Sequence, residues 1–165
     1  MGGFFGVAST DDCVTDLFYG TDYHSHLGTK RGGLAVRNED GLKTFIHNIE
    51  NAQFRSKFED DILRLNGPAG IGVISYYDDQ PLIIGSHLGT YAIVTVGVIN
   101  NADELTSRAF GKKAHFTEMS GGFINPTELA ATLINEGATF EAGIANARTS
   151  AMRRSKNSAL ARLYW

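Results

Sequence analysis

Cysteine is nearly absent from this sequence, because Cys13 is the only one among 165 residues. A single cysteine excludes an internal disulfide and a zinc site built from several thiolates. Long hydrophobic runs are missing as well, since no segment approaches the roughly 20 apolar residues that a membrane-spanning helix needs. The first residues also lack the basic stretch followed by an apolar one that is typical of a secretory signal. We therefore expect a cytoplasmic protein that is not inserted in a membrane.

The sequence also has no excess of positively charged residues. The chain has 15 lysines and arginines against 18 aspartates and glutamates, which gives a formal net charge of −3. Proteins that bind nucleic acid generally present a basic surface to the phosphates, so general nucleic-acid binding is not expected. The charge is uneven, however, because residues 142–165 have no acidic side chain and five basic ones, Arg148, Arg153, Arg154, Lys156 and Arg162. This basic tail leaves a module that binds nucleic acid or an acidic membrane as one alternative.

The length of 165 residues fits one domain with a sizeable core. Apolar and β-branched segments predict strands at 3–8, 34–36, 42–46, 70–77, 82–85 and 91–99. The last of these is apolar almost throughout, so we expect it to be central in a sheet. Helical spacing of apolar residues predicts helices from about residue 12 toward 27, and at 54–65, 102–110 and 126–135. Because the strands come mainly in hairpins with helices before and after, the pattern favours an α+β fold.

Three polar residues near the end of the first predicted helix, Asp22, His24 and His26, are candidates for a metal site. Two histidines two positions apart share a face only in a strand, so ordinary polar side chains and no metal are expected here. The carboxylates of segment 76–79 are interpreted as a solvated turn between strands. The glycines of segment 67–72 enter a strand and lack a following Lys-Ser/Thr pair, so neither a phosphate loop nor a cofactor is predicted.

The thiol of Cys13 is a candidate nucleophile. Asp11, Asp12 and Asp16 surround it in the sequence, and nearby negative charge raises the pKa of a thiol. A thiol with a raised pKa is a poor nucleophile at neutral pH. The sequence therefore predicts that Cys13 is a small packed side chain.

Four segments, GGFFGVAS, LGTKRGGLAV, GIGVISYYDDQPL and VTVGVINNADEL, resemble in this order the landmarks of class II glutamine amidotransferase domains. Within that class the resemblance is strongest to the glutamine phosphoribosylpyrophosphate amidotransferase (amidophosphoribosyltransferase) family of purine biosynthesis. It implies an N-terminal nucleophile (Ntn) hydrolase-like αββα sandwich, with two antiparallel sheets between helical layers. It also implies that Gly6, Arg31 and Gly32 are scaffold residues that preserve turns and packing.

Domains of this family begin, once the initiator methionine is removed, with a cysteine. Its thiolate attacks the glutamine amide, and its free amine acts as the base. Gly2 occupies that position in this sequence. Methionine is readily removed before so small a residue, so the amine would be present. An amine without a side-chain nucleophile cannot form a thioester, however.

Three further positions remove chemistry that the resemblance implies. The arginine that holds the glutamine carboxylate aligns with Ser75, which cannot supply a charged fork. The Asn-Gly pair of the oxyanion hole aligns with Val96 and Gly97, so the side-chain donor is replaced. The aspartate that binds the α-amino group aligns with Pro126. We therefore expect that the scaffold is kept, that no catalytic residue is intact and that glutamine hydrolysis is lost.

The resemblance divides the chain into a glutamine amidotransferase type 2-like domain, residues 1–141, and an atypical basic tail, residues 142–165. Family domains continue with further core strands, so we expect a sandwich that is incomplete at the C-terminus. From about Arg148 the tail is expected to be a truncated, frame-shifted or divergent end that is mobile or weakly helical. The main hypothesis is a pseudoenzyme with a structural or regulatory role, which forms a homo-oligomer or binds a separate phosphoribosyltransferase-type partner. The alternative is an active glutaminase or amidotransferase that uses another nucleophile, for which Cys13 is the only thiol.

Overall fold

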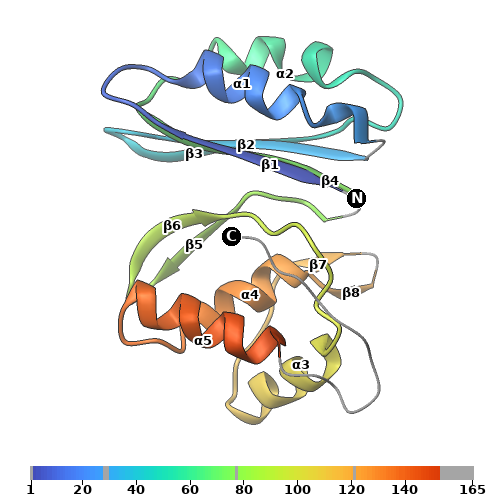
Figure 1. Cartoon of the computed structure of the whole chain (residues 1–165), viewed down its shortest axis with the longest axis vertical. Coiled ribbons are helices and arrows are strands. Elements are labelled where there is room, and N and C mark those ends of the chain that lie inside the picture. The colour runs from blue at the N-terminus through green and yellow to red at the C-terminus, as the bar shows by residue number, and fades with distance from the viewer. Residues whose placement is uncertain (1, 28–29, 77, 121, 153–165) are drawn as a thin grey trace. The chain divides into compact units, whose positions relative to one another are not determined.

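The computed structural model describes residues 2–27, 30–76, 78–120 and 122–152 (Figure 1). By its internal contacts the chain divides into two compact units. The first unit comprises the residues up to Ile83 together with Tyr91–Val96. The second comprises Ile84–Thr90 and the residues from Gly97 onward.

The first unit is built on a four-stranded antiparallel sheet with the strand order β1-β4-β2-β3. The strands are β1 (Gly3–Ala8), β2 (Arg31–Asn38), β3 (Gly41–Asn48) and β4 (Ala69–Ser75). A tight turn joins β2 to β3, in which the Asn38 side chain accepts a hydrogen bond from the Asp40 N–H at 3.0 Å. Gly41 follows with a φ of 119°, a conformation that favours glycine. The predicted hairpin is therefore confirmed, with strands longer than the sequence suggested.

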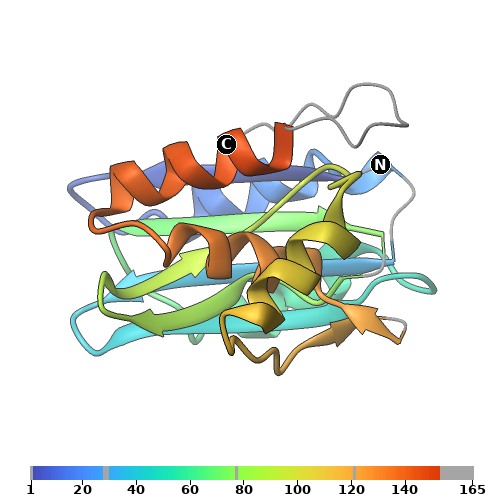
Figure 2. The same cartoon turned by 90° about the horizontal axis from the view of Figure 1, so that it is seen from below.

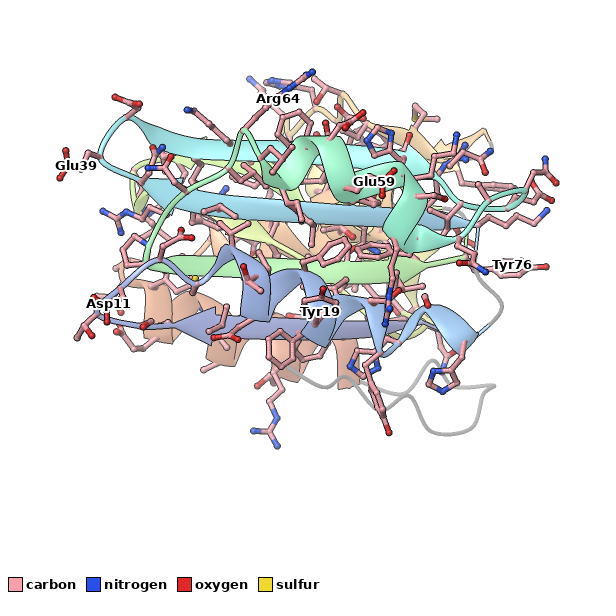
Figure 3. The ribbon with its side chains drawn as sticks, turned by 90° about the horizontal axis from the view of Figure 1, so that it is seen from above. Asp11, Tyr19, Glu39, Glu59, Arg64 and Tyr76 are labelled. Atoms are coloured by element: carbon pink, nitrogen blue, oxygen red, sulfur yellow. The ribbon has the colours of Figure 1, made fainter. Side chains whose placement is uncertain are left out.

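Two helices, α1 (Val14–Asp22) and α2 (Phe54–Ile62), cover one face of this sheet (Figure 3). A short 3₁₀ turn, η1 (Ser25–Leu27), follows α1. Apolar side chains of both helices and of the strands form one buried cluster, which includes Leu17, Phe18, Leu34, Phe54, Phe58 and Ile74. The rings of Phe54 and Phe58 stack with their centroids 4.4 Å apart. Burial of this apolar surface is the main stabilisation of the first unit.

The direction of the β4 side chains follows from this core. Ile74 points toward the helices, because it belongs to the buried cluster that they form. A Cβ on Gly72 would meet the side chain of Thr21 on α1, so position 72 faces the same side. Successive strand residues point to opposite faces, so Val73 and Ser75 face away from α1 and α2.

The strand predicted at 91–99 is wrong in its length and its place. The structure has β5 (Leu82–Ser86) and β6 (Gly89–Ile93), which form a two-stranded sheet with each other. β6 ends at Ile93, Gly97 has a φ of 148°, and Val98 is 70% exposed. The apolar run therefore crosses a strand end and a glycine turn. A continuous apolar run does not by itself distinguish a central strand from a short one followed by a partly buried connection.

The second unit is mainly helical. Its elements are α3 (Ala102–Gly111), the short strands β7 (Met119–Ser120) and β8 (Phe123–Ile124), α4 (Pro126–Ile134) and α5 (Phe140–Met152). The helices α4 and α5, orange and red in Figure 2, pack against each other. Among residues 140–151 of α5 the buried ones are Gly143, Ala147 and Ala151, which recur every four residues on one face. Small side chains there allow the two helices to approach closely.

The helix α5 contains the start of the basic stretch that begins at Arg148. That stretch is expected to be mobile or weakly helical because it lacks a stripe of large apolar side chains. Its described residues, 148–152, are helical, and the buried face of α5 consists of small residues instead. The boundary expected between residues 141 and 142 falls inside this helix and stays a prediction. Arg153, Arg154, Lys156 and Arg162 lie outside the described residues.

The described residues thus combine five α-helices with antiparallel strand pairs, which confirms the mixed class expected from the sequence. Among these residues, no helix is long and apolar enough to cross a membrane.

Candidate functional site

Gly2 lies beside the end of β4. It precedes β1, whose first residue, Gly3, pairs with Ile74. A Cβ on Gly2 would collide with the carbonyl oxygen of Ile74 and would lie 3.5 Å from the Cα of Ser75. The structure therefore brings together Gly2 and Ser75, two of the positions singled out in the sequence. It leaves no room for a side chain on Gly2 unless the backbone shifts.

Ser75 is buried and its hydroxyl is used within its own loop. Its Oγ donates a hydrogen bond to the carbonyl oxygen of Asp78 at 2.5 Å. Its carbonyl oxygen accepts a hydrogen bond from the Lys30 N–H at 3.1 Å. The polar groups of Ser75 thus hold the start of the β4–β5 connection in place.

Arg31 is the cation in register with Ser75, since the two residues pair across β2 and β4. Its Nε lies 2.9 Å from a carboxylate oxygen of Asp79. Segment 76–79 connects two strands, as predicted, but its carbonyl and carboxylate groups bind Ser75 and Arg31 rather than only solvent. Tyr77 lies outside the described residues.

Gln80 completes this region. Its side chain is 2% exposed and binds the backbone of Thr95 in both directions. The Gln80 Nε2 donates to the Thr95 carbonyl at 3.0 Å, and the Thr95 N–H donates to Oε1 at 2.8 Å. A Cβ on Gly33 would collide with the carbonyl oxygen of Gln80, so this loop packs directly on the backbone of β2. No local pattern in the sequence distinguishes a glutamine that makes such contacts from an exposed one.

The remaining predicted positions are Val96, Gly97 and Pro126. Val96 is half-buried and Gly97 is exposed, and the two residues belong to different units. Pro126 is the first residue of α4, where its missing N–H costs no helical hydrogen bond. Asn125 precedes it as the N-cap and accepts a hydrogen bond from the Thr127 N–H at 2.8 Å. Asn followed by Pro, Thr and Glu is a recognisable helix start, so the sequence held a signal for this cap.

Cys13 is 1% exposed and forms the N-cap position of α1. Burial raises the pKa of its thiol above the ordinary value, and the carboxylates of Asp12 and Asp16 raise it further. The thiol is therefore protonated at neutral pH and inaccessible to a substrate in this conformation. Both properties agree with the packed role that the sequence predicted.

Two of the three candidate metal residues, Asp22 and His26, make polar contacts with other groups. The Asp22 carboxylate accepts hydrogen bonds from Arg55 Nε at 2.7 Å and from Ser25 Oγ at 3.4 Å. His26 Nδ1 lies 2.5 Å from the carbonyl oxygen of Tyr23. Within the described residues, no group of three or more histidine, cysteine, aspartate or glutamate side chains is placed to hold a metal ion.

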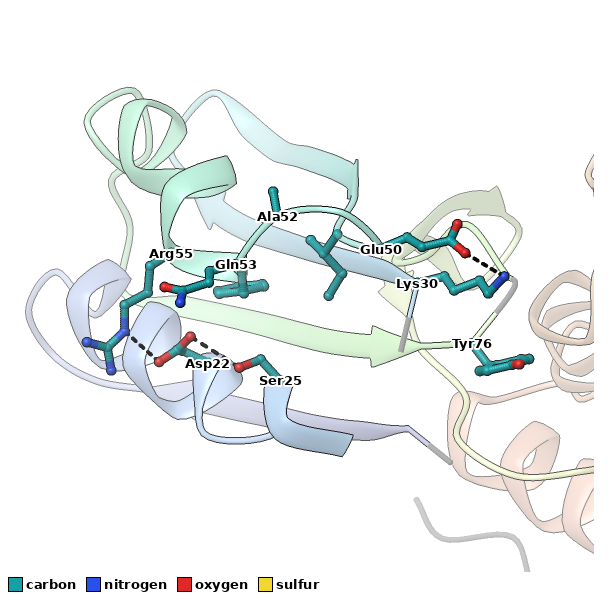
Figure 4. Close-up of a pocket in the computed structure, with 10 residues that line it drawn as sticks. Asp22, Ser25, Lys30, Glu50, Ala52, Gln53, Arg55 and Tyr76 are labelled. Atoms are coloured by element: carbon teal, nitrogen blue, oxygen red, sulfur yellow. Dashed lines mark hydrogen bonds and ion pairs between the residues drawn. The ribbon is translucent and has the colours of Figure 1, made fainter. Parts of the chain in front are cut away.

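An open pocket of about 670 Å³ lies on the helix-covered side of the first unit. It is formed by the end of α1, the connection from β3 to α2, the start of α2 and the residues that flank β2 and β4 (Figure 4). Its lining residues are Asp22, Ser25, Lys30, Ile49, Glu50, Ala52, Gln53, Phe54, Arg55 and Tyr76. Apart from the metal candidate Asp22, none of them was singled out for a ligand, because the segments that supply them are far apart in the sequence.

No protein-family model and no curated protein matches the chain. Solved structures do: a glutamine phosphoribosylpyrophosphate (PRPP) amidotransferase from B. subtilis, complexed with ADP and GMP, matches 91% of this chain with a TM-score of 0.76 and 22% identity. This chain has the fold of the matching part of that PRPP amidotransferase. The structure of an allosteric regulatory enzyme of purine biosynthesis is also similar, with a TM-score of 0.76 and 20% identity over 91% of this chain.

The resemblance to class II glutamine amidotransferase domains is thus confirmed at the level of the fold. In both comparisons the match covers 33% of the other chain, so this chain spans about a third of the length of those proteins. Similarity of fold does not show that catalytic residues are shared. The function of this chain therefore depends on the groups at Gly2, Ser75 and their surroundings.

Proposed function

We propose that this chain is a glutamine amidotransferase type 2-like domain with an Ntn hydrolase-like αββα sandwich that does not hydrolyse glutamine. One observation carries the proposal: Gly2 has no side chain, and the carbonyl oxygen of Ile74 occupies the space that a Cβ would need. Hydrolysis through an N-terminal nucleophile requires a side chain at that position. A terminal amine can take a proton, but it cannot form the covalent intermediate.

The surroundings of Ser75 support the same proposal. A glutamine carboxylate is held best by a bidentate guanidinium, and serine offers a neutral hydroxyl instead. That hydroxyl already donates to Asp78, and the nearest cation in register, Arg31, already pairs with Asp79. A substrate carboxylate at this place would compete with contacts that the loop makes with itself.

An active enzyme that uses Cys13 is the second candidate, and the geometry makes it the weaker one. The thiol is buried, and its pKa is raised by burial and by two nearby carboxylates. A nucleophilic cysteine normally lies in a partly exposed, electropositive place where its pKa is lowered. Cys13 has the opposite environment.

We further propose a structural or regulatory role exerted through association, either as a homo-oligomer or with a separate phosphoribosyltransferase-type partner. The support is the similarity of the fold to part of the PRPP amidotransferase structures. Size-exclusion chromatography with light scattering tests the homo-oligomer directly. A monomer that also fails to bind a purified phosphoribosyltransferase domain would contradict the proposed role.

Glutamate release from glutamine tests the loss of hydrolysis, measured with the wild-type chain and with the Gly2→Cys and Cys13→Ala variants. We expect no release from any of them, because Gly2→Cys restores a thiol without the carboxylate fork and in a place where the Cβ collides with Ile74. Circular dichroism shows whether each variant is folded. Hydrolysis by the wild type that is lost in Cys13→Ala would establish the second candidate, and hydrolysis by Gly2→Cys would show that the binding positions are intact.

An electrophilic glutamine analogue provides an independent readout. Mass spectrometry after incubation should find the wild-type chain unmodified. A stoichiometric adduct on Cys13, blocked by excess glutamine, would contradict the proposal. An adduct that glutamine does not block would be ordinary thiol alkylation, which a denatured sample serves to calibrate.

A further inference from the structure

The pocket of Figure 4 is separate from the positions used in the proposed function. Phe54 and Ile49 line it and are part of the cluster that covers the helix side of the sheet. Ser75 points to the opposite side, since its neighbour Ile74 lies in that cluster. A ligand in this pocket would therefore lie on the opposite side of β4 from the Ser75 side chain, and its binding does not depend on the proposed function.

The pocket is lined by two ion pairs that lie toward opposite ends (Figure 4). At one end, Arg55 Nε lies 2.7 Å from the Asp22 carboxylate. At the other, Lys30 Nζ lies 2.8 Å from the Glu50 carboxylate. The formal charges of these four lining residues cancel. A ligand that carries both charges can place each one beside a lining residue of opposite charge without adding net charge to the pocket.

One end of the pocket can bind a further anionic group, and the other can bind a further cationic group. Arg55 uses its Nε toward Asp22, and a guanidinium has four other N–H donors in the same plane. It lies in the first turn of α2, which contains no acidic residue and whose N-cap, Gln53, makes no side-chain capping bond. The amide dipoles of that turn favour a carboxylate. This end can therefore bind the anionic group of a ligand.

The opposite end suits an ammonium group. The Glu50 carboxylate has a second oxygen beside the one that faces Lys30, and a carboxylate accepts several hydrogen bonds. The ring of Tyr76 lies there as well, with Lys30 Nζ 5.8 Å from its centroid. Between the two ends, Ile49, Ala52 and Phe54 supply an apolar lining.

We propose that this pocket binds a small zwitterion of the amino-acid class, an α-amino acid or a dipeptide. Its carboxylate binds at Arg55 and the start of α2, and its ammonium group binds at the Glu50 carboxylate. The apolar lining between them takes the aliphatic part of the ligand. The two charges of a dipeptide lie farther apart than those of a single amino acid. The probe that binds more tightly therefore indicates which charge separation matches the distance between the two binding ends of the pocket.

The test uses the full chain with L-leucine and L-leucyl-L-leucine as probes, in isothermal titration calorimetry and in NMR of ¹⁵N-labelled protein. For the tighter probe, the N-acetylated form removes the positive charge and the C-terminal amide removes the negative one. Each change should weaken binding about 10- to 100-fold, because each removes a charge-assisted hydrogen bond. Chemical-shift changes should centre on the lining residues, with those of the opposite face of β4 unaffected.

Two variants locate the charges, and two matched variants serve as controls. Arg55→Gln should lower the affinity for the zwitterion about 10-fold or more and leave the affinity for the C-terminal amide unchanged. Glu50→Gln should likewise lower the affinity for the zwitterion about 10-fold or more, and it should leave the affinity for the N-acetylated form unchanged. Lys43→Gln and Asp40→Asn change an ion pair of the same unit that does not line the pocket, and both should bind like wild type.

The proposal is overturned if neither probe binds at millimolar concentration, or if the blocked forms bind as tightly as the free zwitterion. It is also overturned if inorganic phosphate displaces the probe and binds tighter, since that would make the pocket an anion site. These results come from the wild-type protein, so they hold even where a variant does not fold.

Discussion

Gly32 on β2 offers a stringent test of the packing between the sheet and its helices. The rings of Phe54 and Phe58 lie directly over it. A Cβ added to Gly32 would lie 3.0 and 3.1 Å from two carbons of Phe54 and 3.2 Å from one of Phe58. Ordinary contacts between carbon atoms are about 3.5–4.0 Å. The substitution Gly32→Ala therefore requires the rings to withdraw by several tenths of an ångström.

The rings have little freedom to do so. Phe54 and Phe58 are 2% and 0% exposed, and they are stacked on each other at 4.4 Å. Phe18 packs against Phe54 at 5.7 Å, and His47 packs edge-on against Phe58 at 4.7 Å. Overpacking of a close-packed core costs about 1–3 kcal/mol. For a chain of this length that corresponds to a melting temperature about 2–10 °C lower.

Gly6→Ala on β1 is the matched control. It makes the same change in the same sheet, but the nearest atom to its Cβ would be the Gly70 carbonyl oxygen, 4.0 Å away. Alanine restricts the unfolded chain and suits a strand better than glycine, so Gly6→Ala should be neutral or stabilising by up to about 1 kcal/mol. The free energy of unfolding of both variants is measured by urea titration followed by circular dichroism.

A double variant separates ring contact from other effects of the substitution. Phe54→Leu removes the ring that lies nearest to Gly32, so Gly32→Ala should cost less in that background, by about 0.5 kcal/mol or more. If Gly32→Ala is as stable as Gly6→Ala, or if the two changes are additive, the rings do not constrain Gly32 and the packing argument is refuted.

Three other predictions follow from single contacts. Asp61 is buried and lies 2.5 Å from His47 Nε2, so Asp61→Ala should destabilise the protein by about 1–3 kcal/mol in urea unfolding, whereas the exposed Asp60→Ala should be nearly neutral. Asn125→Ala removes the N-cap of α4 and should cost about 0.5–2 kcal/mol in the same assay; a change below that range would mean that Pro126 alone sets the helix start. Because the folded pKa of Cys13 is raised, the wild type should lose stability relative to Cys13→Ala as the pH rises above the ordinary pKa of a thiol, and not below it. A thiol reagent should accordingly react with the native chain much more slowly than with the unfolded one.

Much of the sheet could be predicted from local sequence, because the signals for its hairpin are short-range. The turn at 38–41 and the helix start at 125–128 contain residues whose backbone preferences determine the structure almost alone. The place of residues 91–99 could not be predicted in this way. Their apolar character fits several positions in a fold, and the choice is made by contacts such as that of Gln80 with Thr95, which no local pattern reveals.

The helix α5 illustrates a second limit. A search for large apolar residues at helical spacing passes over it, because its buried face consists of Gly143, Ala147 and Ala151. A Cβ on Gly143 would collide with the carbonyl oxygen of Ile134 on α4, so the partner's backbone rather than a side chain defines the fit. Contacts of this kind depend on where α4 lies, and that information is absent from the segment itself.

At the candidate site, some residues could be singled out from the sequence, whereas the contacts between them could not. Gly2, Ser75 and Pro126 could be singled out from the sequence because a resemblance gave their positions a chemical meaning. What the sequence did not contain is how the neighbouring groups are used: Ser75 with Asp78, Arg31 with Asp79, and Gln80 with Thr95. Each such hydrogen bond contributes about 0.5–1.5 kcal/mol net, so opening this loop for a substrate would cost several of them at once. A single substitution at Gly2 adds a nucleophile but removes none of these contacts, and this is why we expect that restoring the thiol alone does not restore glutamine hydrolysis.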